Sequence, residues 1–113
     1  MDCIFCKIVA GEIPADILYQ NDEVIAFRDI NPLAPTHLLV IPKKHISSLA
    51  QLSEADSSLV GDMVNAANQL AKREGVTESG YRLVLNCGKQ GGQLVPHLHM
   101  HLLGGRQLSG ALG

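Results

Sequence analysis

The chain has 113 residues, a net charge of −2 and 46% apolar residues. This length suits a single domain over residues 1–113, and its core has to be aliphatic because there are two Phe, two Tyr and no Trp. The charged residues form no basic stripe, which excludes a nucleic-acid binder, and no run approaches the roughly 20 apolar residues of a membrane span. Three cysteines, an odd number, and a start without a signal-peptide pattern lead us to expect a cytoplasmic protein.

The first half of the chain predicts one short helix and three strands. Residues 6–10 form a helical turn, which Gly11 ends. Residues 17–19 and 24–28 follow as two strands joined by a tight turn. Residues 37–41, His-Leu-Leu-Val-Ile, are apolar almost throughout, and such a run indicates a strand that is buried on both faces.

The second half predicts one long helix and two more strands. The helix begins at Ser53, where Asp56 three residues later makes a variant of the capping box, and Gly75 ends it. Residues 81–86 and 97–103 are the last strands. The chain therefore predicts an α+β fold, with a mostly antiparallel sheet of about five strands, one long helix and a short N-terminal helix.

Three histidines alternate with apolar residues in the last of these strands. Alternate side chains of a strand share a face, so His97, His99 and His101 point the same way. Such a row is a chance feature of an exposed face, a metal site of the H-x-H kind, or a centre for nucleophilic attack on phosphorus. The glycine-rich segment 88–92 just before it favours the third interpretation, because backbone amides there can hold a phosphate, although a plain hairpin connection explains the glycines too.

The other two histidines have to be divided between two places. An extended chain from His37 to His45 spans about 26 Å, so one site cannot use both unless the chain turns back. If the two histidine-bearing strands pair antiparallel, His37 lies near His101 and His45 lies near His97. The sequence thus predicts a catalytic group of His37, His99 and His101, and a separate pair of His45 and His97.

This separate pair has two potential partners at the start of the chain. Cys3 and Cys6 form a C-x2-C motif, and structural zinc takes four ligands in a tetrahedron. A Cys2His2 site of Cys3, Cys6, His45 and His97 completes that number and would tie the N-terminus to the sheet. The alternative is two buried cysteines beside two ordinary histidines. Cys87 fits a small buried apolar position.

Several motifs together resemble one known family. Residues 97–103 match the H-φ-H-φ-H-φ-φ signature of the histidine-triad (HIT) superfamily, in which φ is apolar. Residues 27–32, 35–45 and 104–106 are similar to segments of its Hint branch. The resemblance runs from about Cys3 to Gln107.

The resemblance implies a HIT-like fold and a homodimer in which two sheets join into one. It implies hydrolysis of nucleoside 5′-phosphoramidates, typically of purines, through a nucleotidyl-histidine intermediate. By position, His99 resembles the nucleophile, and His101 and His37 resemble its partners in phosphate binding and proton handling. Members with a C-x2-C start are expected to hold zinc, and catalysis requires no metal.

The resemblance also implies contacts with the nucleotide. Asp29 resembles a carboxylate that accepts both ribose hydroxyls, although it could simply cap a turn. Asn86 and the Gly92 amide resemble phosphate and leaving-group contacts, although Asn86 could be an ordinary strand end. The remaining positions expected to contact substrate, most of them in an apolar slot for the base that could equally be plain core, are Ile4, Phe5, Ile8, Phe27, Ile30, Leu39, Gln93 and Val95.

Two positions depart from the Hint pattern and keep other functions open. Leu94 stands where that branch usually has a serine near the leaving group, and leucine cannot donate a hydrogen bond. The tail 107–113 lacks the tryptophan of animal members. A dinucleoside polyphosphate hydrolase, a nucleotidyltransferase and a non-catalytic nucleotide- or zinc-binding regulator therefore remain alternatives.

Overall fold

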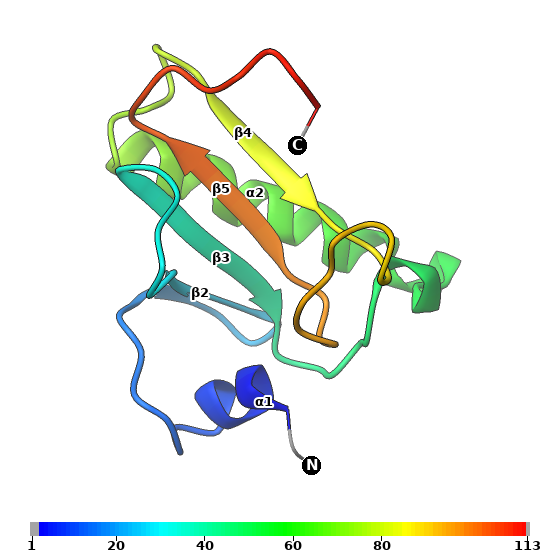
Figure 1. Cartoon of the computed structure of the whole chain (residues 1–113). Coiled ribbons are helices and arrows are strands. Elements are labelled where there is room, and N and C mark those ends of the chain that lie inside the picture. Colours follow the sequence, from blue (N-terminus) through cyan, green and yellow to red (C-terminus); the bar gives the residue numbers. More distant parts are fainter. Residues whose placement is uncertain (1–2, 113) are drawn as a thin grey trace.

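A computed structural model describes residues 3–112 and contains one five-stranded sheet. The strands are β1 (Ile17–Gln20), β2 (Val24–Arg28), β3 (Thr36–Pro42), β4 (Tyr81–Leu85) and β5 (Met100–Gly104). All four pairings are antiparallel, in the order β1-β2-β3-β5-β4, and Figure 1 labels β2 to β5 of this sheet. The predicted α+β class and sheet are confirmed, and within the described residues the sheet is wholly antiparallel.

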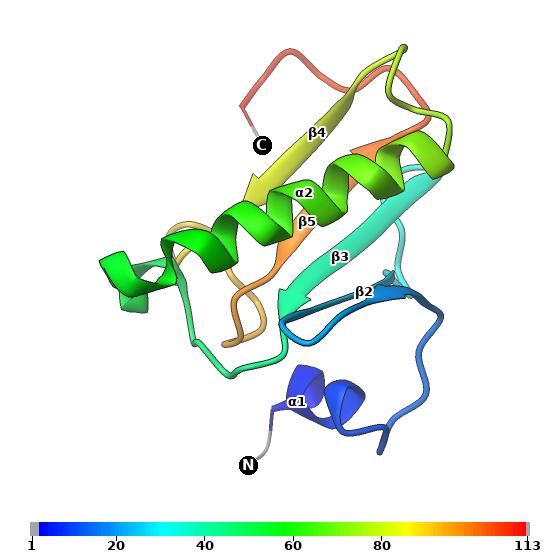
Figure 2. The same cartoon turned by 180° about the vertical axis from the view of Figure 1, so that it is seen from behind.

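Two helices pack on opposite faces of the sheet. The long helix α2 (Ser57–Arg73) lies across one face, as the view from behind shows (Figure 2). The short helix α1 (Ile4–Val9) packs on the other face, at the end of the molecule away from the C-terminal segment. Single 3-10 turns at Leu49–Gln51 and Glu54–Asp56 connect β3 to α2. No helix in the described part of the chain is both long and apolar enough to cross a membrane.

The central strand β3 is buried on both faces, as its apolar run predicts. Leu38 and Val40 point into the core beneath α2, whereas Leu39 and Ile41 join the cluster beneath α1. Because alternate residues share a face, His37 lies on the α1 side of the sheet. The α1 face of the sheet thus carries both an apolar cluster and the first of the histidines.

The structure corrects three predicted boundaries. The short helix, predicted over residues 6–10, begins at Ile4 and ends at Val9. The long helix does not begin at Ser53, because Ser53 and Asp56 make a capping box around a 3-10 turn that precedes α2. The last strand does not begin at His97: β5 starts at Met100, since the Leu98 N–H donates to the Ile46 carbonyl at 2.6 Å and not to a neighbouring strand. The side chains of residues 97–99, which precede β5, nevertheless alternate between the two faces as predicted.

Candidate active site

Three histidine rings gather on the α1 face of the sheet. His37 lies at the start of β3, His101 lies in β5, and His99 lies just before β5. The register pairs His101 with Leu39, so His37 is its diagonal neighbour, and Nε2 of His37 lies 2.9 Å from Nδ1 of His101. The ring centres of His99 and His101 are 5.0 Å apart. The predicted catalytic group is therefore brought together.

A backbone amide determines the tautomer of His37. The Leu33 N–H donates to His37 Nδ1 at 3.0 Å, so that nitrogen carries a lone pair and Nε2 carries the proton. Nε2 therefore donates to Nδ1 of His101, and Oδ2 of Asp29 lies 3.3 Å from the same Nε2. Since Nδ1 of His101 accepts, the neutral ring keeps its own proton on Nε2.

His99 is oriented by a backbone carbonyl. Its Nδ1 lies 2.7 Å from the carbonyl oxygen of His97, which can only accept, so Nδ1 is the protonated nitrogen. The lone pair is left on Nε2, which is the state that a nucleophile needs. A backbone carbonyl, and not His37, therefore fixes this tautomer.

Burial keeps the two other rings neutral. Burial lowers the pKa of His101 to about 4, and the neighbouring His99 and His37 lower it as well, against the opposing effect of Asp29. Burial also lowers the pKa of His37, again opposed by Asp29. Both rings are therefore uncharged at neutral pH and act as hydrogen-bond donors.

The loop that orients His37 is held by Arg106. Its guanidinium donates to the Leu33 carbonyl from Nε at 3.2 Å and from the terminal nitrogen at 2.8 Å. The same residue, Leu33, presents the N–H that His37 accepts, in the preceding peptide group. Sequence reasoning did not assign a role to Leu33 or Arg106. The motif at residues 104–106 was the one signal that pointed here.

The glycine-rich loop is organised by Gln93. The Gln93 side chain accepts from the Gly88 N–H at 2.9 Å and donates to the Ser47 carbonyl at 2.7 Å. Its amide group is thus engaged within the protein, which its predicted role as a substrate contact did not anticipate. Asn86 lies beside the loop, where its Nδ2 would be 4.0 Å from a Cβ on Gly92. Asn86 and the Gly92 backbone therefore lie close together.

Most of the predicted base slot is core in the single chain. Phe5, Ile8, Phe27 and Leu39 belong to one buried cluster beneath α1, and Val95 packs against it. The side chains predicted for the slot that remain open to solvent are Ile30, 88% exposed, and Ile4, 47% exposed.

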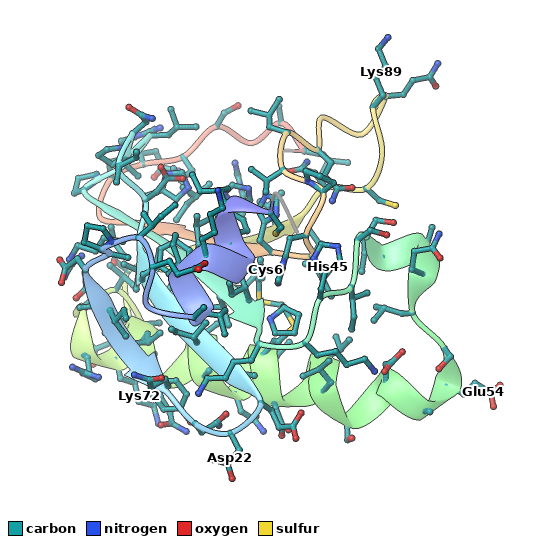
Figure 3. The ribbon with its side chains drawn as sticks, turned by 90° about the horizontal axis from the view of Figure 1, so that it is seen from below. Cys6, Asp22, His45, Glu54, Lys72 and Lys89 are labelled. Atoms are coloured by element: carbon teal, nitrogen blue, oxygen red, sulfur yellow. The ribbon has the colours of Figure 1, made fainter. Side chains whose placement is uncertain are left out.

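The four predicted metal ligands meet at one point. Nδ1 of His97 lies 3.2 Å from Sγ of Cys3, 3.6 Å from Sγ of Cys6 and 3.2 Å from Nδ1 of His45. Sγ of Cys6 and Nδ1 of His45 are also 3.2 Å apart, and these two residues lie side by side in Figure 3. Ordinary Zn–S and Zn–N bonds give tetrahedral edges of about 3.6 Å between sulfur and nitrogen and about 3.3 Å between two nitrogens. The donor set therefore fits zinc.

A hydrogen bond from His97 to the backbone supports this fit. Nε2 of His97 lies 2.9 Å from the Pro42 carbonyl, so it donates and leaves the Nδ1 lone pair for a metal.

A second cluster of potential ligands has a different character. Its ligand atoms, on Asp29, His37 and His101, also lie within 4.8 Å of one another. Both nitrogens of His37 are used there, with Nδ1 accepting and Nε2 protonated, so this second cluster fits a hydrogen-bonded relay and not a metal.

Comparisons with known proteins agree with this geometry. Residues 10–108 match the model of the HIT domain family. The chain is 50% identical over 107 residues to the purine nucleoside phosphoramidase of Escherichia coli K12, covering 95% of this chain and 90% of that protein. It superposes on a HIT family hydrolase from Legionella pneumophila with a TM-score of 0.97 and 51% identity, covering 99% and 100% of the two chains. A histidine triad protein from Clostridium difficile gives a TM-score of 0.95 at 46% identity, covering 99% and 97%. The chain belongs to the HIT domain family.

Proposed function

We propose that the protein is a nucleotide hydrolase of the purine nucleoside 5′-monophosphoramidase type, with His99 as its nucleophile. The observation that carries the proposal is the 2.7 Å contact between Nδ1 of His99 and the His97 carbonyl, which leaves a lone pair on Nε2. The similarity to the Escherichia coli phosphoramidase supports the substrate class.

In the first step, Nε2 of His99 attacks the α-phosphorus of a nucleoside 5′-phosphoramidate. A phosphorus–nitrogen bond to His99 forms, and the bond from phosphorus to the leaving amine breaks. The amine keeps that electron pair and takes up a proton from a neighbouring donor group. The Nε2–H of His101 is the donor for the phosphoryl oxygens, together with the Asn86 amide and the Gly92 N–H. The His97 carbonyl stabilises the positive charge that develops on the His99 ring.

In the second step, water attacks the same phosphorus. A phosphorus–oxygen bond forms as the water gives up a proton to the group that protonated the amine, the bond to His99 breaks with its electron pair returning to Nε2, and the nucleoside monophosphate leaves. Asp29 is our candidate for the ribose hydroxyls, since the Asn31 N–H holds its Oδ1 at 2.8 Å and fixes the carboxylate. Ile30 is exposed beside it and is our candidate for contact with the base, whose slot also includes Phe5, Ile8, Phe27, Leu39 and Val95.

The test is to trap the intermediate. Mixing the protein with an adenosine phosphoramidate and quenching at once should give a mass increase of one nucleotidyl group on the peptide that contains His99. His99→Ala should lower kcat by at least about a thousandfold, with nucleotide affinity nearly unchanged. A clean His99→Ala preparation that turns over at the normal rate would refute the proposal.

Leu94 keeps a second candidate function open. This residue is 91% exposed on the loop before the histidines, so it has no packing role and is free to meet a leaving group. Leucine cannot donate a hydrogen bond to a leaving amine, which keeps open hydrolysis of dinucleoside polyphosphates, or nucleotidyl transfer to another acceptor, by the same nucleophile. Comparing kcat/KM for phosphoramidates and diadenosine polyphosphates separates the two. Nucleotide binding without any turnover would favour a non-catalytic regulator.

We further propose that Cys3, Cys6, His45 and His97 hold a structural zinc ion. The donor set and its spacing support this, as does the hydrogen bond from His97 to Pro42. When bound, the ion supplies a cross-link between the N-terminal segment and the sheet. Metal analysis of the purified protein should find about one zinc per chain, and Cys6→Ser should lower that content. A metal-free wild-type protein with unchanged thermal stability would contradict this assignment.

A homodimer and a cytoplasmic location complete the proposal. Strand β4 is at an edge of the sheet and its five residues are all only half-buried, so it has free backbone groups for a partner. The other edge, β1, has four residues and an irregular register, which suits it less for pairing. A cytoplasmic location agrees with thiolate ligands, which need a reducing environment.

A further inference from the structure

Phe5 connects the metal cluster to the nucleophile. It lies between Cys3 and Cys6 in sequence, on α1, and is 6% exposed. Its ring stands edge-on to His97, with ring centres 5.8 Å apart and an angle of 77°. It makes the same kind of contact with His99, at 5.2 Å and 80°. One aromatic ring thus packs against a metal ligand and against the nucleophile.

His97 takes part in both sites as well. Its Nδ1 belongs to the metal cluster, its Nε2 donates to the Pro42 carbonyl, and its own carbonyl accepts from Nδ1 of His99. Both groups that hold the His99 ring on this side, the Phe5 ring and the His97 carbonyl, therefore come from the metal-binding segments. A shift of either would move the nucleophile.

His99 depends on these contacts because it lies outside the regular ladder. The pairing of β3 with β5 begins at Met100, one residue later. Helix α1 has only six residues, and a helix of that length has little stability of its own in water. Two cysteine sulfurs and two imidazole nitrogens that converge within 4.8 Å also form a donor set that suits a cation.

We propose that the metal at Cys3, Cys6, His45 and His97 positions the nucleophile, with Phe5 and the His97 carbonyl as the parts that act on His99. This rests on the proposed function for the role of His99, and on the proposed zinc site. Metal binding holds α1 in its position on the sheet, and α1 in turn keeps the Phe5 ring in contact with the His99 ring. Phe5 is a positioning residue in this scheme, in addition to its place in the predicted base slot.

The first test needs no substrate. Imidazole nitrogens of the wild-type protein are labelled, and the exchange of the His99 Nδ1–H with water is followed by NMR in the zinc-loaded and the chelated form. We expect exchange at least tenfold faster without metal, with the backbone amide of Leu102 in the core unchanged. Equal exchange at His99 would overturn the proposal. Equal loss of protection at Leu102 would also overturn it, because the metal would then stabilise the whole fold and nothing more specific.

The second test separates positioning from base binding. Phe5→Leu should keep the zinc and lower kcat at least tenfold, with KM within about threefold of the wild-type value. Val9→Ala is the matched control, because Val9 is on the same helix and packs against the same cluster. It should leave kcat within about twofold. A Phe5→Leu variant in which KM rises and kcat is unchanged would assign Phe5 to the base alone and overturn the proposal.

The two proposals fail in different ways. A zinc-loaded wild-type protein that forms no nucleotidyl-His99 would refute the proposed function, yet the exchange experiment would still decide whether the metal positions the ring. A normal nucleotidyl adduct with metal-independent exchange would leave the function standing and refute the positioning role.

Discussion

At the scale of single residues, backbone groups set the tautomers of three of the histidines. The Leu33 N–H sets His37, the His97 carbonyl sets His99, and the Pro42 carbonyl sets His97. A peptide group has no pKa in the working range, so each of these backbone partners keeps its role as donor or acceptor when the pH changes. The site therefore presents one lone pair, on Nε2 of His99, and neutral donors around it.

The low pKa of His101 predicts a loss of stability in acid. The folded-state pKa of about 4 lies below the unfolded value of about 6.5, so between these values the unfolded chain binds a proton that the folded chain does not. His101 therefore leaves the free energy of unfolding undiminished above pH 6.5. As the pH falls towards 4, it lowers that free energy by roughly 1–3 kcal/mol. Urea unfolding of wild type and His101→Gln at pH 5 and 7 should show the smaller pH dependence in the variant. An identical pH dependence would contradict the expectation.

The loop before the histidines depends on Gly91 for close packing. A Cβ on Gly91 would lie 2.2 Å from the Cys87 carbonyl oxygen, and backbone cannot yield as a flexible side chain does. Gly91→Ala should therefore open the loop, displace Asn86 and the Gly92 amide, and lower kcat/KM at least tenfold. Gly110→Ala is the control, because its Cβ meets nothing within 4 Å, and it should leave kcat/KM unchanged. Steady-state kinetics with an adenosine phosphoramidate decides between these outcomes.

At the scale of elements, α2 is joined to the sheet by packing and by charge. Its buried face includes Met63 and Leu70, both no more than 1% exposed. At its C-terminal end, Arg28 of β2 donates two hydrogen bonds to the Glu74 carboxylate, at 2.8 and 3.0 Å. These hydrogen bonds hold the pKa of Glu74 below its usual value. The end of β2, and with it Asp29, is thereby attached to the helix.

Gly61 is a weak point of this helix. It is exposed in the interior of α2, its φ is not positive, and a Cβ there would meet nothing. Gly61→Ala should raise the free energy of unfolding by about 0.5–1 kcal/mol, because alanine loses less conformational entropy in a helix. Gly75→Ala should lower it by about 1 kcal/mol, since Gly75 has a φ of +73°. Thermal unfolding of the pair checks both signs, and a destabilised Gly61→Ala would count against the helix bounds.

At the scale of the whole molecule, the sheet order decides where chemistry and assembly occur. Strands β3 and β5, which carry His37 and His101, are neighbours in the interior of the sheet, so the triad has a rigid base. Strand β4 lies beside β5 at the edge, one strand away from the triad. If a second chain paired with β4, the active site of each chain would lie close to the interface.

This edge makes the proposed dimer testable by hydrogen exchange. In a lone edge strand, only alternate N–H groups are bonded to the neighbouring strand. In a dimer joined through β4, the outward N–H groups of residues 81–85 are protected as well. We expect protection of consecutive amides in β4 and a mass of two chains by sedimentation. Alternating protection with the mass of one chain would contradict the dimer, and β1 serves as the internal reference for a free edge.

The sequence by itself determined what depends on local pattern. Alternation placed Leu98, Met100 and Leu102 in the core and the histidines opposite them, the apolar run of β3 predicted burial on both faces, and antiparallel pairing correctly divided the five histidines between two places. The extent of the domain, residues 1–113, stays a prediction.

Only the tertiary structure decided the chemical state of the site. Which nitrogen carries a proton in His37, His97 and His99 depends on backbone groups, and every residue has the same C=O and, except proline, the same N–H, so no residue type signals them. The starts of α2 and β5 shifted for a related reason, because a 3-10 turn and the hydrogen bond from Leu98 to Ile46 took backbone groups that the pattern assigned to helix and strand. The contact between Phe5 and His99 joins residues 94 positions apart in the chain, and only the packing of α1 on the sheet brings them together.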